Sequence, residues 1–320
     1  MRQTTLLAAL LFAGSSLFAA DPQLLAMAPS DATTYAGINV TQAKTSQFGQ
    51  FLLNNIPQNA DIQTFITKTG FDPRTDLTEV LMAATLTAPA ANAATQNGHP
   101  SFSSGLVLAK GTFNIPKIVA TAGADQKVQL STYAGVQLLT IDGTMAFGLI
   151  DASTAAVGDL VSVKAALDRR TGPGSAIDSG TMARINELST TEDAWSVSTK
   201  GLAGALPMLG TGDSGSAVLQ SIQQSSGGIK FGSSVVLTVQ VIADSTQDAA
   251  SLSDVVKMLS QMASMHSGTG GAPSELTNLL KGLTISTDGT AVNLSLTVAE
   301  DQLEALVKMA HGSGMAAATI

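Results

Sequence analysis

Acidic side chains at Asp72, Asp76 and Glu79 place three carboxylates within the eight residues DPRTDLTE. Carboxylate oxygens at such spacing are ligands that Ca²⁺ accepts, but a calcium loop offers denser oxygen ligands and a glycine at its bend. This segment has neither, so we expect Asp76 to cap a helix or a strand, with Arg74 as its neutralising neighbour.

Thioether and imidazole groups, which suit Cu(I), recur at Met258, Met262, Met265 and His266. Met262 and His266 are four residues apart and would share one face of a helix. Met262 also continues the apolar stripe that begins at Leu252, where methionine is ordinary core filling. We therefore expect a core helix and assign no metal ligand.

The glycines of GTGDSG at 210–215 match the spacing of the dinucleotide-binding fingerprint. That fingerprint needs a preceding strand and an acidic residue about 20 positions later. Here Pro207 interrupts the preceding segment, and no acid occurs between residue 215 and Asp244. We expect a loop that ends in a helix cap at Asp213 or Ser214, and no cofactor.

Gly212 to Gly215 also resembles the nucleophile segment of chymotrypsin-like serine proteases. That mechanism needs a histidine to accept the serine proton. His99, His266 and His311 all lie in or beside segments rich in glycine and serine, and Ser216 replaces the family's next glycine. No Gly-x-Ser-x-Gly elbow is present either, so we expect no serine nucleophile.

Trp195 is the single tryptophan, and it either anchors a core or lines a binding groove. Its position in a predicted strand beside Val197 favours the core. Asp151, Asp159 and Asp168 are too scattered to be assigned paired acid–base roles. No catalytic, cofactor-binding or metal-binding residue is therefore assigned from the sequence.

Charge and composition exclude several classes of function. The 320 residues carry a net charge of −8, and Arg169-Arg170 is the densest basic spot, so a nucleic-acid partner is not expected. Cysteine is absent, which excludes disulfides, thiolate ligands and lipid attachment at a cysteine. Charged residues make up only 12% of the chain, against roughly 25% in typical proteins, so neutral polar residues must wet much of the surface.

The first 20 residues, MRQTTLLAALLFAGSSLFAA, predict an export signal. Arg2 supplies the basic start, Leu6 to Ala13 the apolar run, and Ala19-Ala20 the small-residue exit. The run is too short to span a bilayer, which takes roughly 20 apolar residues. We expect a periplasmic or secreted bacterial protein with no stable membrane span after signal cleavage.

The apolar patterns predict an α+β protein with mostly antiparallel, curved sheets and helices packed on one face. Predicted segments that bear on later findings are a loop at 89–104, a helix at 216–224 and one apolar run at 229–242 with a bulge at Gly232. The predicted organisation is a signal at 1–20, a first half at 21–171, a connecting segment at 172–191, a second half at 192–311 and a flexible tail at 312–320.

Matching signals suggest that the two halves derive from a duplication. Asp142-Gly143-Thr144 and Asp288-Gly289-Thr290 each lie between apolar strands, and Asp-Gly is a strong hairpin signal. Asp31-Ala32 and Asp193-Ala194 open corresponding strands. Two short matching turns also arise by chance, so both interpretations stay open.

Two phrases resemble a broad set of uncharacterised secreted bacterial proteins. The first is Pro29 to Tyr35 (PSDATTY), which leads into a strand. The second is Ala156-Val157-Gly158-Asp159, a strand that leads into the helix Val161 to Leu167. The resemblance implies a strand-rich α+β exported protein, and it carries over no functional residue.

Three hypotheses for function follow. The first is an exported, non-catalytic protein that binds a ligand or a partner in the cell envelope. The second is an exported hydrolase whose Asp/Glu pair forms only in the folded chain, at the 5–10 Å separation that glycoside hydrolysis requires. The third is an envelope protein that assembles through sheet edges.

Overall fold

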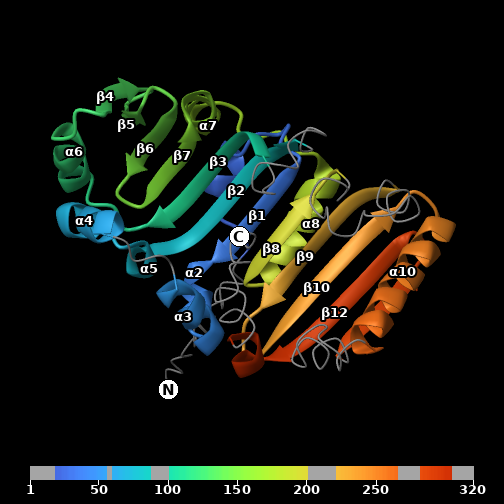
Figure 1. Ribbon diagram of the computed structural model, residues 1–320. Helices are drawn as coiled ribbons and strands as arrows, with labels where there is room; N and C mark the ends of the chain where they lie inside the picture. Colours follow the sequence, from blue (N-terminus) through green and yellow to red (C-terminus); the bar gives the residue numbers. More distant parts are fainter. Residues whose placement is uncertain (1–18, 56–59, 88–100, 201–220, 266–281, 305–320) are drawn as a thin grey trace, which may run out of the picture.

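The computed structural model describes residues 19–55, 60–87, 101–200, 221–265 and 282–304 (Figure 1). Within these residues the chain forms one continuous 12-stranded sheet in the order β11-β12-β10-β9-β8-β1-β2-β3-β7-β6-β5-β4. Every neighbouring pair is antiparallel. The predicted α+β class is confirmed.

The strands are β1 (Thr34–Asn39), β2 (Leu77–Thr87), β3 (Ser101–Gly111), β4 (Val128–Tyr133), β5 (Val136–Ile141), β6 (Met145–Asp151), β7 (Thr154–Asp159), β8 (Ala194–Ser198), β9 (Ile222–Lys230), β10 (Ser234–Ala243), β11 (Leu283–Asp288) and β12 (Ala291–Ala299). The helices are α1 (Pro22–Met27), α2 (Val40–Ala43), α3 (Gln47–Asn54), α4 (Ala60–Thr69), α5 (Pro73–Asp76), α6 (Ile115–Gly123), α7 (Leu160–Thr171), α8 (Ser179–Thr191) and α10 (Thr246–Met265).

Local sequence signals account for many of the element ends. Asp159 begins α7 by accepting the Ser162 amide at 2.8 Å, as expected of an N-cap carboxylate. In the turn between β5 and β6, Asp142 and Gly143 have φ of 50° and 72°. A type I′ turn requires positive φ at both central positions, so the Asp-Gly hairpin prediction at this turn is confirmed.

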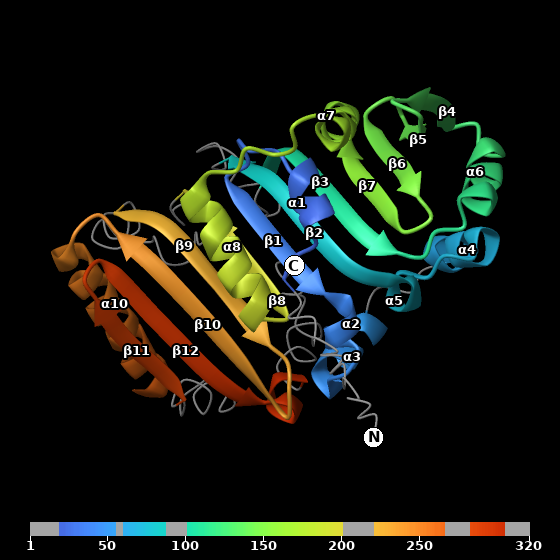
Figure 2. The same ribbon diagram turned by 180° about the vertical axis from the view of Figure 1, so that it is seen from behind.

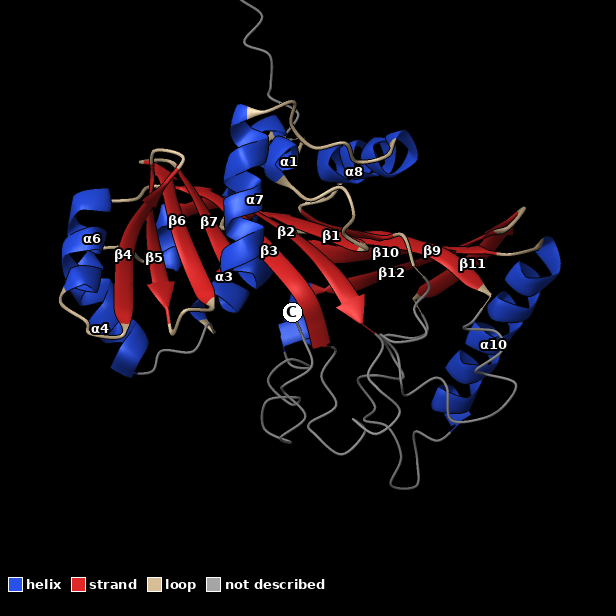
Figure 3. Cartoon of the chain, turned by 90° about the horizontal axis from the view of Figure 1, so that it is seen from above, coloured by secondary structure: helices blue, strands red, loops and turns tan. Residues whose placement is uncertain are grey.

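Helices cover both faces of the sheet, so the prediction of helices on one face is wrong. We call the face with α3, α6 and α10 the front face (Figure 1) and the face with α1, α7 and α8 the back face (Figures 2 and 3). The reason is visible in β5, where Leu138 packs with the back-face core and its neighbour Leu139 with the front-face core. Successive strand residues point to opposite faces of the sheet. A strand with apolar residues on both faces therefore needs helices packed on both faces.

The two halves share a strand order. The first half runs β1-β2-β3-β7-β6 outward from the centre of the sheet, and the second runs β8-β9-β10-β12-β11. β1 and β8 pair at the centre, with Gly37 opposite Trp195. By this order the Asp288 turn corresponds to the β6–β7 turn and not to the Asp142 turn, which joins β5 and β6. The duplication itself stays a prediction.

Several predicted segments need correction or lie outside the described residues. Ile222 to Gln224 belong to β9 rather than to a helix, because pairing with β10 supplies backbone hydrogen bonds at this end of the strand despite the helical spacing. The run at 229–242 is split by a turn that contains Gly232, and residues 101–104 belong to β3. Residues 1–18, 216–220 and 305–320 lie outside the described residues.

Candidate functional site

An acid-lined cavity of about 270 Å³ lies on the back face, against β1, β2 and the start of β8. Its charged and polar lining includes Asp21, Asn39, Glu79, Lys110, Glu192 and Asp193. We call it the acidic cavity. Such a concentration of ionisable groups in a concavity marks a candidate site for binding or acid–base chemistry.

Glu79 is positioned by strand register. It lies on β2 between Asn39 of β1 and Lys110 of β3, so the three side chains share the back face. Its Oε1 accepts the Asp21 backbone N–H at 2.9 Å. Burial raises the pKa of the Glu79 carboxyl above its usual value, and the Asp21 hydrogen bond and the Lys110 charge offset part of that rise.

Glu192 follows the last residue of α8 and reaches away from β2. Its Oε1 accepts the Thr238 hydroxyl at 3.2 Å, and its buried Oε2 has no partner among the described residues. Burial raises the pKa of this carboxyl as well. The side chain crosses β9 directly above Gly228, where a Cβ atom would lie 2.3 Å from Glu192 Cγ.

Gly228→Ala is therefore expected to lower the free energy of unfolding by about 2 kcal/mol, because the methyl group displaces the Glu192 side chain and breaks its bond to Thr238. The matched control is Gly232→Ala, where the added Cβ would meet nothing closer than 3.4 Å. Chemical denaturation followed by circular dichroism measures both variants. Equal midpoints for the two would show that Gly228 is not required for the close approach.

Glu79 and Glu192, the two carboxyl groups of the cavity whose pKa burial raises, do not form a catalytic pair. Glu192 bonds to β10, and β10 and β2 are separated by four strand spacings in the sheet. At about 4.8 Å for each spacing, the carboxylates are roughly 15–20 Å apart. This is beyond the separation of about 5–10 Å used in glycoside hydrolysis, so this geometry offers the hydrolase hypothesis no support from Glu79 and Glu192.

Asp193 is a structural carboxylate at the start of β8. Its side chain is 4% exposed and accepts Lys230 Nζ at 2.8 Å through Oδ1. Its Oδ2 accepts the Phe231 backbone N–H at 2.7 Å. The backbone N–H of Asn39 also donates to the backbone carbonyl of Asp193 at 2.7 Å. Asp193 thus joins β1, β8 and the β9–β10 turn, which explains its burial without a catalytic role.

Trp195 belongs to the back-face core, as the sequence predicts, and its ring also borders the acidic cavity. The residue is 6% exposed. Gly37 on β1 lies beneath the ring, and a Cβ there would be 2.6 Å from Cε2 and Cζ2 of the indole. A glycine opposite the tryptophan is therefore needed for the ring to lie flat across β1.

A second concavity, of about 460 Å³, lies where β8, β9 and β10 run side by side. Alternation places Ser196, Gly227 and Val239 in one row across the three strands on the front face. Ala194, Ile229 and Leu237 form the next row and contact the core beneath α3. None of the described residues that line it is ionisable. We call it the neutral groove.

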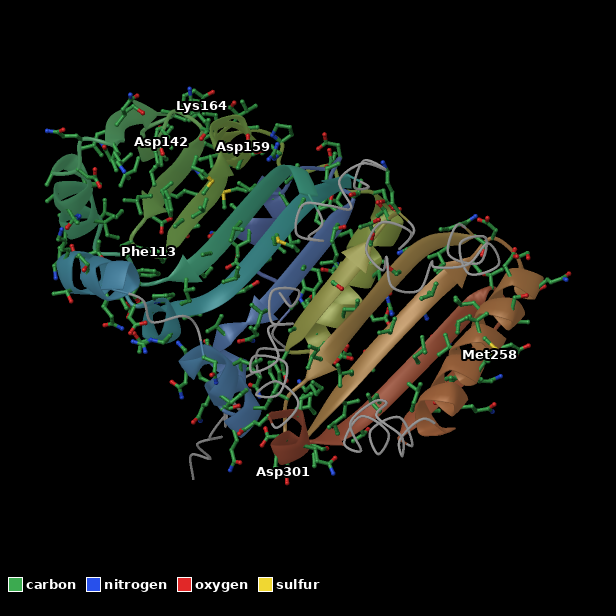
Figure 4. The ribbon with its side chains drawn as sticks, viewed as in Figure 1. Phe113, Asp142, Asp159, Lys164, Met258 and Asp301 are labelled. Carbon is green, nitrogen blue, oxygen red and sulfur yellow. The ribbon has the colours of Figure 1, made fainter. Side chains whose placement is uncertain are left out.

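The residues proposed from the sequence have structural roles where they are described. Asp72 caps α5 and pairs with Arg74 at 2.6 Å. The expectation that Asp76 is the cap and the partner of Arg74 is therefore wrong, because Asp72 fills both roles. Met258 is 51% exposed on α10 and away from any His, Cys, Asp or Glu cluster that could hold a metal among the described residues (Figure 4).

The segment 210–215, His99, His266 and His311 lie outside the described residues, and for Met262 and Met265 only the helical backbone is described.

The motifs of the resemblance serve the fold. The Tyr35 hydroxyl donates to the Pro29 carbonyl at 2.7 Å and closes the PSDATTY loop. Burial raises the pKa of Tyr35 to about 12. In the second motif a Cβ at Gly158 would lie 2.4 Å from the Gly105 carbonyl oxygen, so glycine permits β3 and β7 to pair closely.

Comparison with known proteins identifies the fold class alone. No protein-family model and no curated protein matches the chain. Among solved structures, crystal form III of TP0453 superposes with a TM-score of 0.53 at 11% identity, covering 89% of this chain and 97% of that one. Crystal form IV of TP0453 superposes with a TM-score of 0.52 at 10% identity, covering 88% of this chain and 95% of that one. The likeness shows a shared fold.

In the part of this chain that the structure describes, no helix is long and apolar enough to cross a bilayer.

Sequence reasoning missed most of both concavities. The sequence pattern groups Glu79 with its neighbours Asp72 and Asp76, and it assigns no site role to Asp21, Lys110, Glu192 or Val239. The one local signal for the acidic cavity is Asp21 directly after the small-residue exit of the export signal. The neutral groove leaves no local signal, because serine, glycine and valine are ordinary strand residues.

Proposed function

We propose that this chain is an exported, non-catalytic protein that binds a neutral, largely apolar ligand in the neutral groove. The observation that carries this proposal is the make-up of the groove, which combines an apolar row with serine and glycine and has no ionisable group in its described lining. A ligand with a charge would lose its hydration there without gaining a partner. An apolar ligand would gain from burial in proportion to its area.

The size of the groove also fits a small ligand. Its volume of about 460 Å³ falls within the roughly 300–1,000 Å³ of ordinary ligand pockets. Val239 lies on β10 at one side of the groove and is 43% exposed, between the part of β10 that α3 covers and the part that α10 covers. An exposed valine between two covered stretches gives the ligand an apolar surface to bury.

Val239→Glu is expected to weaken binding of a neutral apolar probe, such as N-phenyl-1-naphthylamine, at least tenfold, because the probe would have to desolvate a carboxylate. Leu130→Glu is the matched control, since Leu130 is also 43% exposed but lies on β4, far along the sheet. Probe fluorescence titrated against each variant measures the effect. Equal affinities for the two variants, or no binding by the parent chain, would contradict the proposal.

We also propose that the protein is periplasmic or secreted, on the support of the signal pattern at 1–20. Cell fractionation and determination of the first residue of the exported chain test this. Retention of the uncut chain in the cytoplasm would contradict it.

The hydrolase hypothesis remains a prediction, and the Glu79 and Glu192 carboxyls give it no support because they lie too far apart. The duplication remains a proposal as well. It is supported by the parallel strand orders about the β1–β8 pair and by α6 and α10, which each follow the third strand of their half on the front face.

A further inference from the structure

The backbone nitrogen of Asp21 occupies an unusual position, because it donates to a carboxylate that the fold partly buries. The Asp21 N to Glu79 Oε1 distance is 2.9 Å, and the two residues are 58 positions apart in the chain. In the uncut chain this donor is a neutral amide. Charge-assisted hydrogen bonds are roughly twice as strong as neutral ones, so a cation at this position would serve Glu79 better.

The Asp21 nitrogen is held in place by contacts that do not involve residues 1–18. The Asp21 carboxylate caps α1 by accepting the Gln23 amide at 2.7 Å. It also lies 3.3 Å from Lys110 Nζ. α1 itself is anchored in the back-face core through Leu24, which is fully buried, and through Met27, whose carbonyl accepts Arg169 Nε at 2.8 Å.

The local charges are unbalanced in the uncut chain. Among the described residues, the carboxylates of Asp21 and Glu79 face one ammonium group, that of Lys110, which also donates to Gln23 Oε1 at 2.6 Å. The other acids of the cavity are engaged elsewhere, Asp193 with Lys230 and Glu192 with Thr238. One further positive charge at the Asp21 nitrogen would neutralise the group.

We propose that cleavage between Ala20 and Asp21 converts this nitrogen into an α-ammonium group that forms an ion pair with the Glu79 carboxylate. Water hydrolyses the peptide bond, so that Ala20 leaves with the carboxylate and Asp21 keeps the amine, which takes up a proton. The inference rests on the proposed export, because the small-residue exit at Ala19-Ala20 is what places the cut here. Glu79 is then a receptor for the mature N-terminus.

Removal of residues up to Ala20 also changes the acidic cavity. Ala19 and Ala20 both line it, and Ala20 is 6% exposed. Their departure leaves room beside the new ammonium group. One extra residue at the start of the chain would fill that room and return the Asp21 nitrogen to an amide, so the ion pair requires the cut to fall at one peptide bond.

The sign of the pH dependence follows from the two forms. In the uncut chain, burial raises the pKa of Glu79, so ionised Glu79 costs stability once the pH exceeds the usual carboxyl pKa. In the cut chain, the carboxylate should raise the pKa of the α-ammonium group. While Glu79 is ionised, this stabilisation is fully present below about pH 8, the unfolded pKa of an α-amino group, and is lost as the pH rises through the higher folded value. It is also lost in acid, where the Glu79 carboxylate takes up a proton.

Four chains test the proposal: one that begins at Asp21 and one that begins at Ala20, each with and without Glu79→Gln. They are released from a fusion partner by a protease that leaves no extra residue. We expect Glu79→Gln to lower the Tm of the Asp21 chain at pH 7 by roughly 2–4 °C and to leave that of the Ala20 chain unchanged or raised. Reductive methylation of the α-amine, followed by mass spectrometry, should be several-fold slower in the Asp21 chain than in the same chain carrying Glu79→Gln.

Glu187→Gln is the control, because the Glu187 side chain is 62% exposed and its partner within the described part of the chain is Arg184 on its own helix. Glu187→Gln should change the Tm by the same amount in the chain that begins at Asp21 and in the chain that begins at Ala20. The same effect of Glu79→Gln in both chains would overturn the ion pair whatever the cellular location. An exported chain whose first residue is not Asp21 would overturn the cleavage site while leaving export intact, and a chain that is never exported would overturn the proposed location.

Discussion

Trp195→Ala is expected to lower the free energy of unfolding by about 4 kcal/mol, the largest loss we expect from a single substitution in this chain. The indole is 6% exposed and packs in the back-face core between the sheet and the helices above it. Its removal leaves a large void beside the acidic cavity. Chemical denaturation followed by circular dichroism measures the loss, because the variant has no tryptophan fluorescence.

A double-mutant cycle with Gly37 identifies the cause. Gly37→Ala alone should cost about 2 kcal/mol, since its Cβ would lie 2.6 Å from the indole ring. In the Trp195→Ala background the same methyl group enters the vacated space and should cost almost nothing. Additive losses in the double variant would show that Gly37 is required for some other reason than the ring.

The element types in this fold were predictable because their signals are local. The Asp142-Gly143 turn requires positive φ at neighbouring positions, and the structure has φ of 50° and 72° there. The α10 stripe repeats with helical spacing over several turns, and Leu252 and Val256 do pack on the sheet. Such patterns depend on residues within one or two turns of each other, and a single sequence contains them in full.

The strand in the segment 222–230 was not predictable in the same way. Its sequence, IQQSSGGIK, has little strand propensity, and the run before it suggested a helix. β9 forms because β8 and β10 pair with it on both sides. Tertiary pairing overrides local preference here, and Gly228, which weakens the strand, is needed for the Glu192 side chain to cross it.

The candidate site depends on contacts between distant residues, which no spacing rule provides. Glu79 and Asp21 are 58 positions apart, and the register of β2 against β1 and β3 decides that Glu79 points to the back face. A shift of one residue would have turned it to the front. Composition predicts a largely neutral polar surface, but it does not predict that β8, β9 and β10 bring Ser196, Gly227 and Val239 into one row.

Asp193→Ala is expected to be the second most damaging substitution, with a loss of about 3 kcal/mol in the free energy of unfolding. The side chain is 4% exposed and receives two hydrogen bonds, from Lys230 Nζ at 2.8 Å and from the Phe231 amide at 2.7 Å. Removal of the carboxylate leaves the Phe231 N–H buried without a partner, and an unsatisfied buried donor costs about 1–3 kcal/mol in addition to the lost ionic bond.

Two comparisons separate burial from charge. Asp193→Asn keeps an oxygen for the Phe231 amide but loses the attraction to Lys230, so it should cost about half as much as the alanine variant. Asp254→Ala removes an acid of the same type whose side chain is 79% exposed and whose distance to Lys257 Nζ is 3.7 Å, and such surface pairs contribute little. The denaturation midpoint should therefore be highest for Asp254→Ala, lower for Asp193→Asn and lowest for Asp193→Ala. Equal denaturation midpoints for Asp193→Ala and Asp254→Ala would contradict this role of Asp193. The two aspartates are expected to differ because Asp193 is a buried acceptor at the β9–β10 turn and Asp254 is exposed.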